Sequence, residues 1–147
     1  MAETSFYTEL ELASLGLHSY GENVLISRFA RLYSPETISI GENVRIDDFC
    51  ILSGDITIGS HIHIAAYCAL YGSQGIVMED YTGLSARVTL YSAMDDFDGD
   101  YLIGPIHKKE HVHIMGGMIT LKRYAQVCAG SIVFPNVTIA EGSVIGA

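Results

Sequence analysis

Basic residues are scarce in this sequence. Its 147 residues include 8 Lys and Arg against 17 Asp and Glu, which gives a formal net charge of −9. Proteins that bind nucleic acids do so largely by placing clustered Lys and Arg against the phosphates. The charge balance therefore argues against a nucleic-acid partner and favours small molecules, or further copies of the chain, as partners.

Long hydrophobic runs and a secretory signal are also lacking. The longest wholly apolar stretch, IAAYCALY, has eight residues from Ile64 to Tyr71, whereas a helix needs about 20 to span a bilayer. The N-terminus, MAETSFYTELE, has neither the basic start nor the apolar segment of a secretory signal. We therefore expect a cytoplasmic protein without a membrane span.

Cysteine is limited to Cys50, Cys68 and Cys128. Disulfide scaffolds and zinc sites need more cysteines, or cysteines at closer spacings. Cys50 and Cys68 also occupy equivalent positions in the repeat described next. We interpret all three as core-filling thiols in a reducing compartment.

What the sequence does contain is a repeat of six residues. The segment YGENVLI at 20–26 returns as IGENVRI at 40–46, and 18 residues, 17 of them aliphatic, follow a step of six. A small or β-branched residue usually stands four positions after each of these anchors. Neither a helix nor a simple strand keeps this period, whereas a hexapeptide solenoid does. The anchors are Tyr20, Ile26, Leu32, Ile40, Ile46, Leu52, Ile58, Ile64, Leu70, Met78, Leu84, Leu90, Met115, Leu121, Val127, Val133, Ile139 and Ile145.

The repeat predicts an all-β protein of six triangular coils with three hexads in each. Coils stacked about 4.8 Å apart form a prism roughly 25 to 30 Å long with the anchors inside. The step lengthens by two residues after Leu32 and after Leu70, and 19 residues leave the repeat between Leu90 and Met115. We therefore expect a capping segment at 1–19, a repeat domain at 20–147 and an excursion loop at about 93–111.

The capping segment carries a helix signal. Thr8 and Glu11 have the spacing of a capping box, in which each side chain bonds the backbone of the other residue. Gly16 suits the end of a helix. We expect a helix from about Glu9 to Leu15 that covers the open edge of the first coil, since an uncovered edge invites aggregation.

The hexads ISIGEN-VRIDDF-CILSGD-ITIGSH-IHIAAY and the block VCAGSIVFPNVTIAEGSVIGA resemble those of the hexapeptide-repeat acyltransferases. More narrowly, FYTELELASLG, IDDFC and YSAMDDFDG resemble the short sugar O- and N-acetyltransferases of surface-polysaccharide biosynthesis. The resemblance implies a left-handed parallel β-helix and a homotrimer with active sites between neighbouring prisms. It also implies transfer of an acetyl group from acetyl-CoA to a hydroxyl or amine of a sugar or nucleotide sugar.

Acyl transfer needs a base for the proton of the attacking group and donors for the oxyanion. Many relatives carry a catalytic histidine in the excursion loop, where this chain has Asp95 and Asp96 in YSAMDD. His63, in GSHIHIAAY, lies at an outward position, and its setting resembles the VHIAPG stretch of amino-sugar acetyltransferases. We predict His63 as the base, oriented by Asp95 or Asp96 of a neighbouring loop.

The late coils resemble the part of the family along which the pantetheine arm lies. Ala129 and Gly130, and Gly146 and Ala147, match its small-residue pattern, which lets a ligand approach the backbone. Lys122 and Arg123 are candidates for the CoA phosphates. Related enzymes commonly continue into a basic tail with Pro-Ala-Lys, so we expect that the sequence ending at Ala147 is truncated.

Two other readings remain open. HKKEHVH brings His107, His111 and His113 within seven residues, and imidazoles suit zinc and related metals. The γ-carbonic anhydrases, however, draw such ligands from separate coils with an HxxxxH pair, which this sequence lacks. We expect no metal; Lys108, Lys109 and these histidines more plausibly form a basic rim for an anionic cofactor or a nucleotide-sugar phosphate. A catalytically silent trimeric scaffold is the other alternative.

Overall fold

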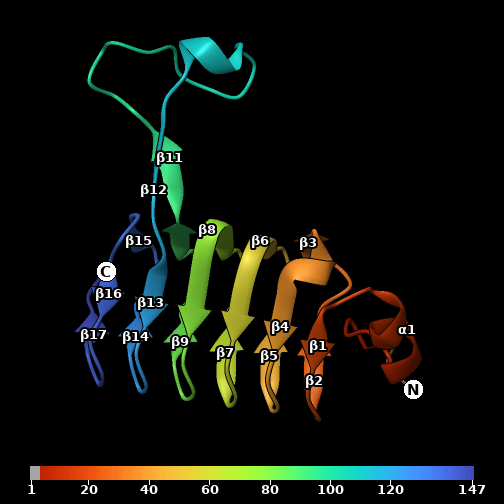
Figure 1. Ribbon diagram of the computed structural model, residues 1–147. Helices are drawn as coiled ribbons and strands as arrows, with labels where there is room; N and C mark the ends of the chain where they lie inside the picture. Colours follow the sequence, from red (N-terminus) through yellow and green to blue (C-terminus); the bar gives the residue numbers. More distant parts are fainter. Residues whose placement is uncertain (1–3) are drawn as a thin grey trace.

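The computed structural model describes residues 4–147 as a three-walled prism of stacked parallel coils (Figure 1). One wall is a six-stranded parallel sheet in the spatial order β17-β14-β9-β7-β5-β2. Its strands are β2 (Val24–Ile26), β5 (Val44–Ile46), β7 (Ile62–Ile64), β9 (Gly83–Leu84), β14 (Gln126–Val127) and β17 (Val144–Ile145). We call this sheet the site wall, because the candidate site lies on its outer face.

The other two walls form one continuous nine-stranded sheet. They are joined because β6 and β8 are long enough to pass from one wall to the next; β6 bulges at Gly54 as it does so. The strands are β1 (Ser19–Tyr20), β3 (Arg31–Tyr33), β4 (Ile38–Ile40), β6 (Ile51–Ile58), β8 (Ala69–Met78), β10 (Thr89–Tyr91), β13 (Ile119–Leu121), β15 (Ile132–Val133) and β16 (Thr138–Ile139). A 3₁₀ turn, η1 (Pro35–Thr37), lies where the first two-residue insertion was expected.

Pairing in register places equivalent anchors above one another. Ile26, Ile46, Ile64 and Leu84 are aligned on consecutive strands of the site wall. Fourteen of the 18 predicted anchors are buried and two, Leu32 and Ile145, are partly buried against the core. The interior is thus a stack of aliphatic side chains, each of which contacts equivalent residues of the coils before and after it.

Two predicted anchors are wrong. Met115 is 48% exposed, because it lies in β12 (Ile114–Gly116), outside the prism. Its strand pairs antiparallel with β11 (Ala93–Asp95), and the chain rejoins the wall only at β13, beside β8. Tyr20 is 40% exposed on β1, which ends the sheet order.

Residues 93–116 form an arm that projects from the prism (Figure 1). It consists of β11, a loop with the 3₁₀ turn η2 (Lys109–His111), and β12. The arm leaves and rejoins the wall at one point, since the backbone N–H of Gly117 donates to the Ser92 carbonyl at 2.8 Å. It extends beyond the predicted end near residue 111.

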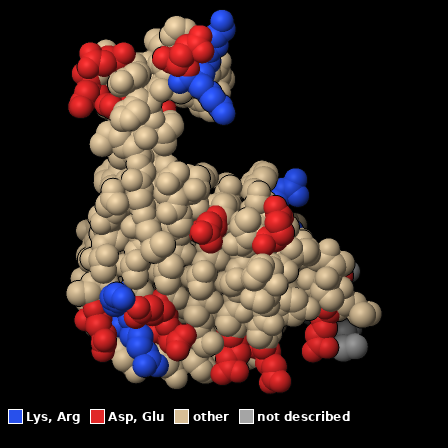
Figure 2. Space-filling view, in the orientation of Figure 1, with Lys and Arg blue, Asp and Glu red and all other residues tan. Residues whose placement is uncertain are grey.

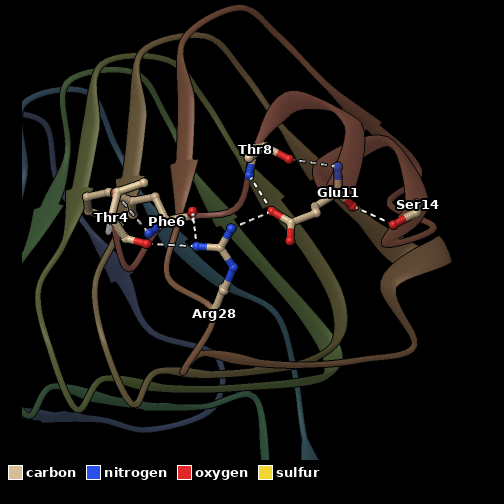
Figure 3. Close-up of polar contacts among 6 residues, drawn as sticks. All are labelled: Thr4, Phe6, Thr8, Glu11, Ser14 and Arg28. Atoms are coloured by element: carbon tan, nitrogen blue, oxygen red, sulfur yellow. Dashed lines mark hydrogen bonds and ion pairs between the residues drawn. The ribbon is translucent and has the colours of Figure 1, made fainter. Parts of the chain in front are cut away.

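The N-terminal segment covers the first coil with α1 (Glu9–Ser14). The predicted capping box is present: the Glu11 N–H donates to Thr8 Oγ1 at 3.3 Å and the Thr8 N–H donates to Glu11 Oε2 at 2.7 Å. Arg28, from the first coil, donates to the carbonyls of Thr4 and Phe6 and to Glu11 (Figure 3). Leu12 is buried against the core. Within residues 4–147, no helix is long and apolar enough to cross a bilayer.

The prism turns its corners through left-handed backbone. We call the corner before the site-wall strands the leading corner and the corner after them the trailing corner. Residues with φ between 53° and 69° recur at the leading corner, at Asn23, Asn43, His61, Tyr81, Tyr124 and Gly142. At the trailing corner, Phe49, Tyr67, Arg87 and Gly130 have φ between 61° and 76°. Some of these side chains stack from coil to coil: Phe49 on Tyr67 at the trailing corner, and His61, Tyr81 and Tyr124 at the leading corner.

Candidate active site

A concavity of about 460 Å³ lies on the outer face of the site wall. Its lining includes His61, His63, Tyr81, Gly83, Ser85 and Gln126. Parallel pairing sets Gly83 beside His63 and Gln126 beside Gly83 on consecutive strands. The concavity therefore lies where the site wall has a glycine, which has no side chain to fill the space.

Gly83 leaves room for the Gln126 side chain. A Cβ added to it would lie 2.4 Å from Gln126 Oε1, because the Gln126 side chain folds across the glycine and donates through Nε2 to the Tyr81 carbonyl at 3.0 Å. Gln126 Oε1 accepts no hydrogen bond from residues 4–147. Beside the rings of His61 and Tyr81, the concavity is thus lined by the His63 imidazole, the Ser85 hydroxyl and the Gln126 amide.

His63 has a carboxylate partner, which the sequence reasoning assigned to other residues. Its Nε2 lies 2.7 Å from Oδ2 of Asp47, which follows the neighbouring strand β5. The second oxygen of Asp47, Oδ1, accepts from Arg45 Nε at 2.7 Å. With Nε2 donating to Asp47, Nδ1 of His63 is left as an acceptor, and it has no hydrogen-bond partner among residues 4–147.

These contacts also fix the charge of Asp47. Burial alone would raise the pKa of its carboxyl, but the hydrogen bonds from Arg45 and His63 outweigh that effect and hold the pKa below its ordinary value. Asp47 is therefore ionised at neutral pH and can both orient the ring and stabilise its positive charge when His63 takes a proton.

Ser85 is a second residue that the sequence reasoning missed. It follows β9, its N–H donates to the Val127 carbonyl at 2.9 Å, and its own carbonyl accepts from the buried thiol of Cys68 at 3.1 Å. The backbone is thus fixed on both sides, while the exposed hydroxyl faces the concavity. A serine in a repeat rich in small residues carries no sequence signal for such a role.

Asp95 and Asp96, both predicted at the site, lie on the arm and have different surroundings. Asp96 is only 8% exposed; its Oδ2 lies 2.8 Å from Nδ1 of His113 and its Oδ1 accepts from the Asp98 N–H at 2.9 Å. These bonds, the one from Asp98 first, lower the pKa of Asp96. Asp95 is half-buried opposite Ile114, and within the described chain no side chain bonds it.

One chain does not bring these aspartates to His63. Strands β11 and β12 stand away from the coils, whereas β7, which carries His63, lies within the site wall (Figure 1). Among residues 4–147, no hydrogen bond or ion pair joins His63 to Asp95 or Asp96.

The residues predicted to hold CoA fall on two corners. Lys122 and Arg123 lie at the leading corner, where Lys122 Nζ is 2.9 Å from Glu79 Oε1 and Arg123 Nη2 is 3.8 Å from Asp80 Oδ2. Figure 2 shows cations and acids interleaved there, at the lower left. The bond from Lys122, followed by the Arg123 N–H, lowers the pKa of Glu79. Both cations are thus partly neutralised.

The small residues of the predicted cofactor region lie at and beyond the trailing corner. Ala129 and Gly130 follow β14, and Gly146 and Ala147 follow β17 directly above it. All four are exposed, and a Cβ at Gly130 or Gly146 would meet nothing within 4 Å. A ligand can therefore approach the backbone here.

The histidine-rich loop shows no metal-binding geometry in the part of the chain that the structure describes. No three His, Cys, Asp or Glu side chains within residues 4–147 converge as ligands. His113 is bonded to Asp96 and stacks against Tyr101 with ring centroids 5.0 Å apart, while His111 lies 3.9 Å from Glu110.

Comparison with known proteins identifies the family. Residues 37–72 match the model of the bacterial transferase hexapeptide (six repeats). A dTDP-4-amino-4,6-dideoxy-D-glucose acyltransferase from Escherichia coli is 40% identical over 146 residues, which cover 97% of this chain and 76% of that protein. The chain belongs to the hexapeptide-repeat sugar acyltransferases.

Solved structures of a family member agree in fold. AntD, an N-acyltransferase from Bacillus cereus, was crystallised as a serine-to-cysteine variant with dTDP-4-amino-4,6-dideoxyglucose and coenzyme A. That structure is 50% identical, has a TM-score of 0.97, and the match covers 99% of this chain and 79% of AntD. AntD with dTDP and 3-hydroxybutyryl-CoA is 51% identical with a TM-score of 0.96, over 99% and 78% of the two chains. The fold is therefore the left-handed parallel β-helix of these enzymes.

Proposed function

We propose that this protein transfers an acyl group from acyl-CoA to the 4-amine of dTDP-4-amino-4,6-dideoxyglucose. The observation that carries this proposal is the near-identity of fold, at 50% sequence identity, with an enzyme crystallised with that sugar nucleotide and coenzyme A. The E. coli relative is named for the same acceptor. The concavity on the site wall supplies the acceptor and donor groups that such a transfer requires.

In the proposed reaction the sugar amine attacks the thioester carbonyl. A C–N bond forms, the C–S bond breaks, the electron pair leaves with the CoA sulfur, and the nitrogen loses one proton. We assign that proton to Nδ1 of His63, whose Nε2–H is held by Asp47. The Ser85 hydroxyl, in the same concavity, is placed to donate to the carbonyl oxygen as it gains negative charge.

Asp95 and Asp96 have separate roles in this proposal. Asp95, whose carboxylate is unengaged within residues 4–147, accepts a hydrogen bond from the neutral sugar amine and orients its lone pair, whereas Asp96 positions the arm through His113. Structures of AntD include variants in which a serine or an aspartate, ten positions apart, was replaced. Ser85 and Asp95 of this chain are also ten positions apart.

We propose that the active protein is a homotrimer whose sites lie between copies. One chain keeps Asp95 away from His63, so a complete site requires the arm of one copy to reach the site wall of another. Exposed apolar side chains on the arm support this arrangement, because such surfaces are usually covered by partners. They include Phe97, Leu102, Ile103 and Ile106.

We further propose that CoA lies along Ala129, Gly130, Gly146 and Ala147, with Lys122 and Arg123 near its phosphates. We also propose that the protein is cytoplasmic.

The acyl group is tested together with the acceptor. Thiol release from acetyl-CoA and from 3-hydroxybutyryl-CoA is measured with dTDP-4-amino-4,6-dideoxyglucose and with a matched dTDP-sugar that has a hydroxyl in place of the amine. We expect turnover with the amine only, and with acetyl-CoA as the better donor. Faster thiol release with the hydroxyl sugar would show that the enzyme transfers the acyl group to oxygen and not to nitrogen. No thiol release with any pair of acyl-CoA and dTDP-sugar would support the catalytically silent scaffold.

A further inference from the structure

The trailing corner carries a continuous column of stacked side chains. The ring centroids of Phe29 and Phe49 are 5.8 Å apart and those of Phe49 and Tyr67 are 5.0 Å apart. Arg87 continues the column on the next coil, with Cζ 5.4 Å from the Tyr67 ring centroid. The three rings are half exposed, so the column forms a ridge on the surface and not a part of the core.

The column ends in an open position above Arg87. The Arg87 N–H donates to the Ala66 carbonyl at 3.1 Å, and one coil later the Gly130 N–H donates to the Ala86 carbonyl at 3.0 Å. Gly130 is thus the next member of the series, with φ of +76°, but it has no side chain, and a Cβ there would meet nothing within 4 Å. The guanidinium lies over the Tyr67 ring, and the next position of the series, at Gly130, has no side chain to stack on it.

Arg87 also differs in its charge environment from most of the other cations of the prism; Arg31 is the exception, since it too has no carboxylate partner within residues 4–147. Arg28, Arg45, Lys122 and Arg123 each lie within 4.0 Å of a carboxylate oxygen. Arg87 has no such partner among residues 4–147. Its guanidinium is therefore available to a ligand as a flat, positively charged stacking surface.

We propose that a nucleobase of a substrate stacks on Arg87 in the space left by Gly130. This inference rests on the proposed function, under which both substrates carry a base: adenine in acyl-CoA and thymine in the sugar nucleotide. A base stacks on aromatic rings and on guanidinium groups alike, so it would extend the series Phe49, Tyr67, Arg87 by one member. The position lies on the coil of Ala129 and Gly130, which the sequence already associates with the cofactor.

The leading corner provides a comparison within the same chain. His61, Tyr81 and Tyr124 stack there at centroid distances of 4.7 and 5.4 Å, and Gly142 follows with φ of +69° and open space around it. Arg123, however, lies over both tyrosine rings, 5.8 and 5.7 Å from their centroids, and pairs with Asp80. That column is thus flanked by a cation that already has a carboxylate partner.

The test separates stacking from charge at Arg87. Binding of CoA and of dTDP is titrated calorimetrically, each ligand alone, to the wild type and to Arg87→Tyr, Arg87→Lys and Arg87→Ser. Loss of one stacked base weakens binding by about 10-fold. We expect that loss in the Lys and Ser variants and near wild-type affinity in the Tyr variant, because a ring replaces the flat surface. Weakening for CoA alone identifies adenine, and weakening for dTDP alone identifies thymine.

A second pair of variants fills the open position itself. Gly130→Tyr places a ring of the protein where the base would lie, and Gly142→Tyr makes the same change at the leading-corner column, whose flanking cation is already paired. The backbone tolerates both changes, since Tyr67 and Tyr124 adopt φ of +63° and +64° at the equivalent corner positions. We expect Gly130→Tyr to weaken the same ligand that the Arg87 variants weaken, and Gly142→Tyr to leave it unchanged.

The outcomes distinguish the inference from the proposed function. If the wild type binds both ligands and Arg87→Ser binds them equally well, the stacking position is refuted while the proposed function stands. Full rescue by Arg87→Lys would also refute it, because a phosphate contact would then account for the effect. If the wild type binds neither CoA nor dTDP, the proposed function fails first.

Discussion

The two carboxylate oxygens of Asp47 have different donors, both of them side chains. Oδ1 accepts from Arg45 and Oδ2 lies against His63, each at 2.7 Å. Arg45 therefore holds the carboxylate in place, and the carboxylate in turn holds the imidazole. Hydrogen bonds to charged groups are stronger than neutral ones, so the three side chains keep one arrangement on a surface where single side chains are otherwise free to move.

The first prediction concerns this pair. His63→Gln is expected to lower kcat by about 100-fold, the low end of the range for loss of a general base. Asp47→Ala is expected to lower kcat by about 10-fold with little change in KM, since it removes only the orientation of the ring and the stabilisation of its charge. Steady-state thiol release measures both effects.

The control for this prediction is the neighbouring residue Asp48, whose carboxylate bonds the Ser27 hydroxyl and not His63. Asp48→Asn should leave kcat unchanged, and Asp47→Asn should recover part of the loss in Asp47→Ala, because an amide oxygen can still accept from Nε2. Full turnover in His63→Gln would show that another group, or the leaving thiolate, takes the proton.

Residues that face inward could be predicted from the sequence, and most residues of the site could not. An inward position is repeated on every coil, so Ile46, Ile64 and Leu84 reinforce one another as a pattern. An outward position carries no such constraint: Arg45, His63 and Gly83 occupy equivalent places on successive coils and share no property. The pairing of His63 with Asp47 depends on contact between neighbouring coils, whereas the sequence prediction placed the carboxylate partner of His63 in the excursion loop.

At the level of elements, the arm differs from the coils in what holds it. It has two short antiparallel strands, and beyond them Asp96 provides a fixed point by bonding the His113 ring, the Asp98 N–H and, through its own N–H, the His113 carbonyl. Arms of this kind open more readily than a packed core, because few apolar contacts hold them.

The second prediction is that the order of the arm depends on pH through Asp96. Its pKa in the folded protein is lowered, so its stabilising contribution is present above the pKa of the unfolded chain and is lost as the pH falls through the lower, folded-state value. At neutral pH, Asp96→Asn should therefore speed hydrogen exchange of the β11 and β12 amides. Below about pH 4, near the ordinary pKa of an aspartate, the difference from the wild type should shrink.

Asp95→Asn is the matched control for the arm, because the Asp95 side chain has no partner there within residues 4–147. It should leave exchange of the arm unchanged while lowering turnover with the amino sugar. The reverse pattern would be faster hydrogen exchange in Asp95→Asn and an unchanged rate in Asp96→Asn. That result would show that the roles assigned to the two residues have to be swapped.

Elements could be predicted where local chemistry decides them. The capping box of Thr8 and Glu11 is a local pattern, and the helix it predicted is present, one residue shorter than expected at its C-terminal end. The length of the arm was underestimated because Met115 is apolar and fits the step of six by chance. Only pairing shows that it lies opposite Met94 in the hairpin and not above Met78.

At the level of the whole molecule, the prism leaves much apolar surface exposed. Phe29, Phe49, Tyr67 and Tyr124 are 50–58% exposed on the corners, and Ile106 on the arm is 86% exposed. Large exposed apolar areas usually mark interaction sites, and homo-oligomers with closed symmetry are the common way to cover them.

The third prediction is that the protein is a trimer in solution. Light scattering coupled to gel filtration should give three times 16.0 kDa, about 48 kDa. A mixture of His63→Gln and Asp95→Asn chains, refolded together, should regain part of the activity that each lacks alone, because some interfaces then combine an intact wall with an intact arm. A mass of one chain with full activity would place the complete site within a single prism.

The architecture as a whole followed from the sequence because one period governs most of the chain. The contact between the site wall and an arm could not be predicted from the sequence. A repeat specifies how the coils of one chain pack on each other, but it does not specify which outward-facing surfaces meet. This is why the stacked triangular coils could be predicted from the hexads, with their left-handedness implied by the family resemblance, whereas the link between His63 and Asp95 is a proposal that requires a second copy of the chain.

The arm begins and ends at neighbouring backbone atoms, where Gly117 bonds Ser92, and the coils on either side pair as if it were absent. Replacement of residues 93–116 by a tight turn, or by an arm of another length, would therefore leave every inward-facing side chain of the prism in place. The arm can therefore be replaced, in evolution or by design, without a change in the residues that make the prism fold.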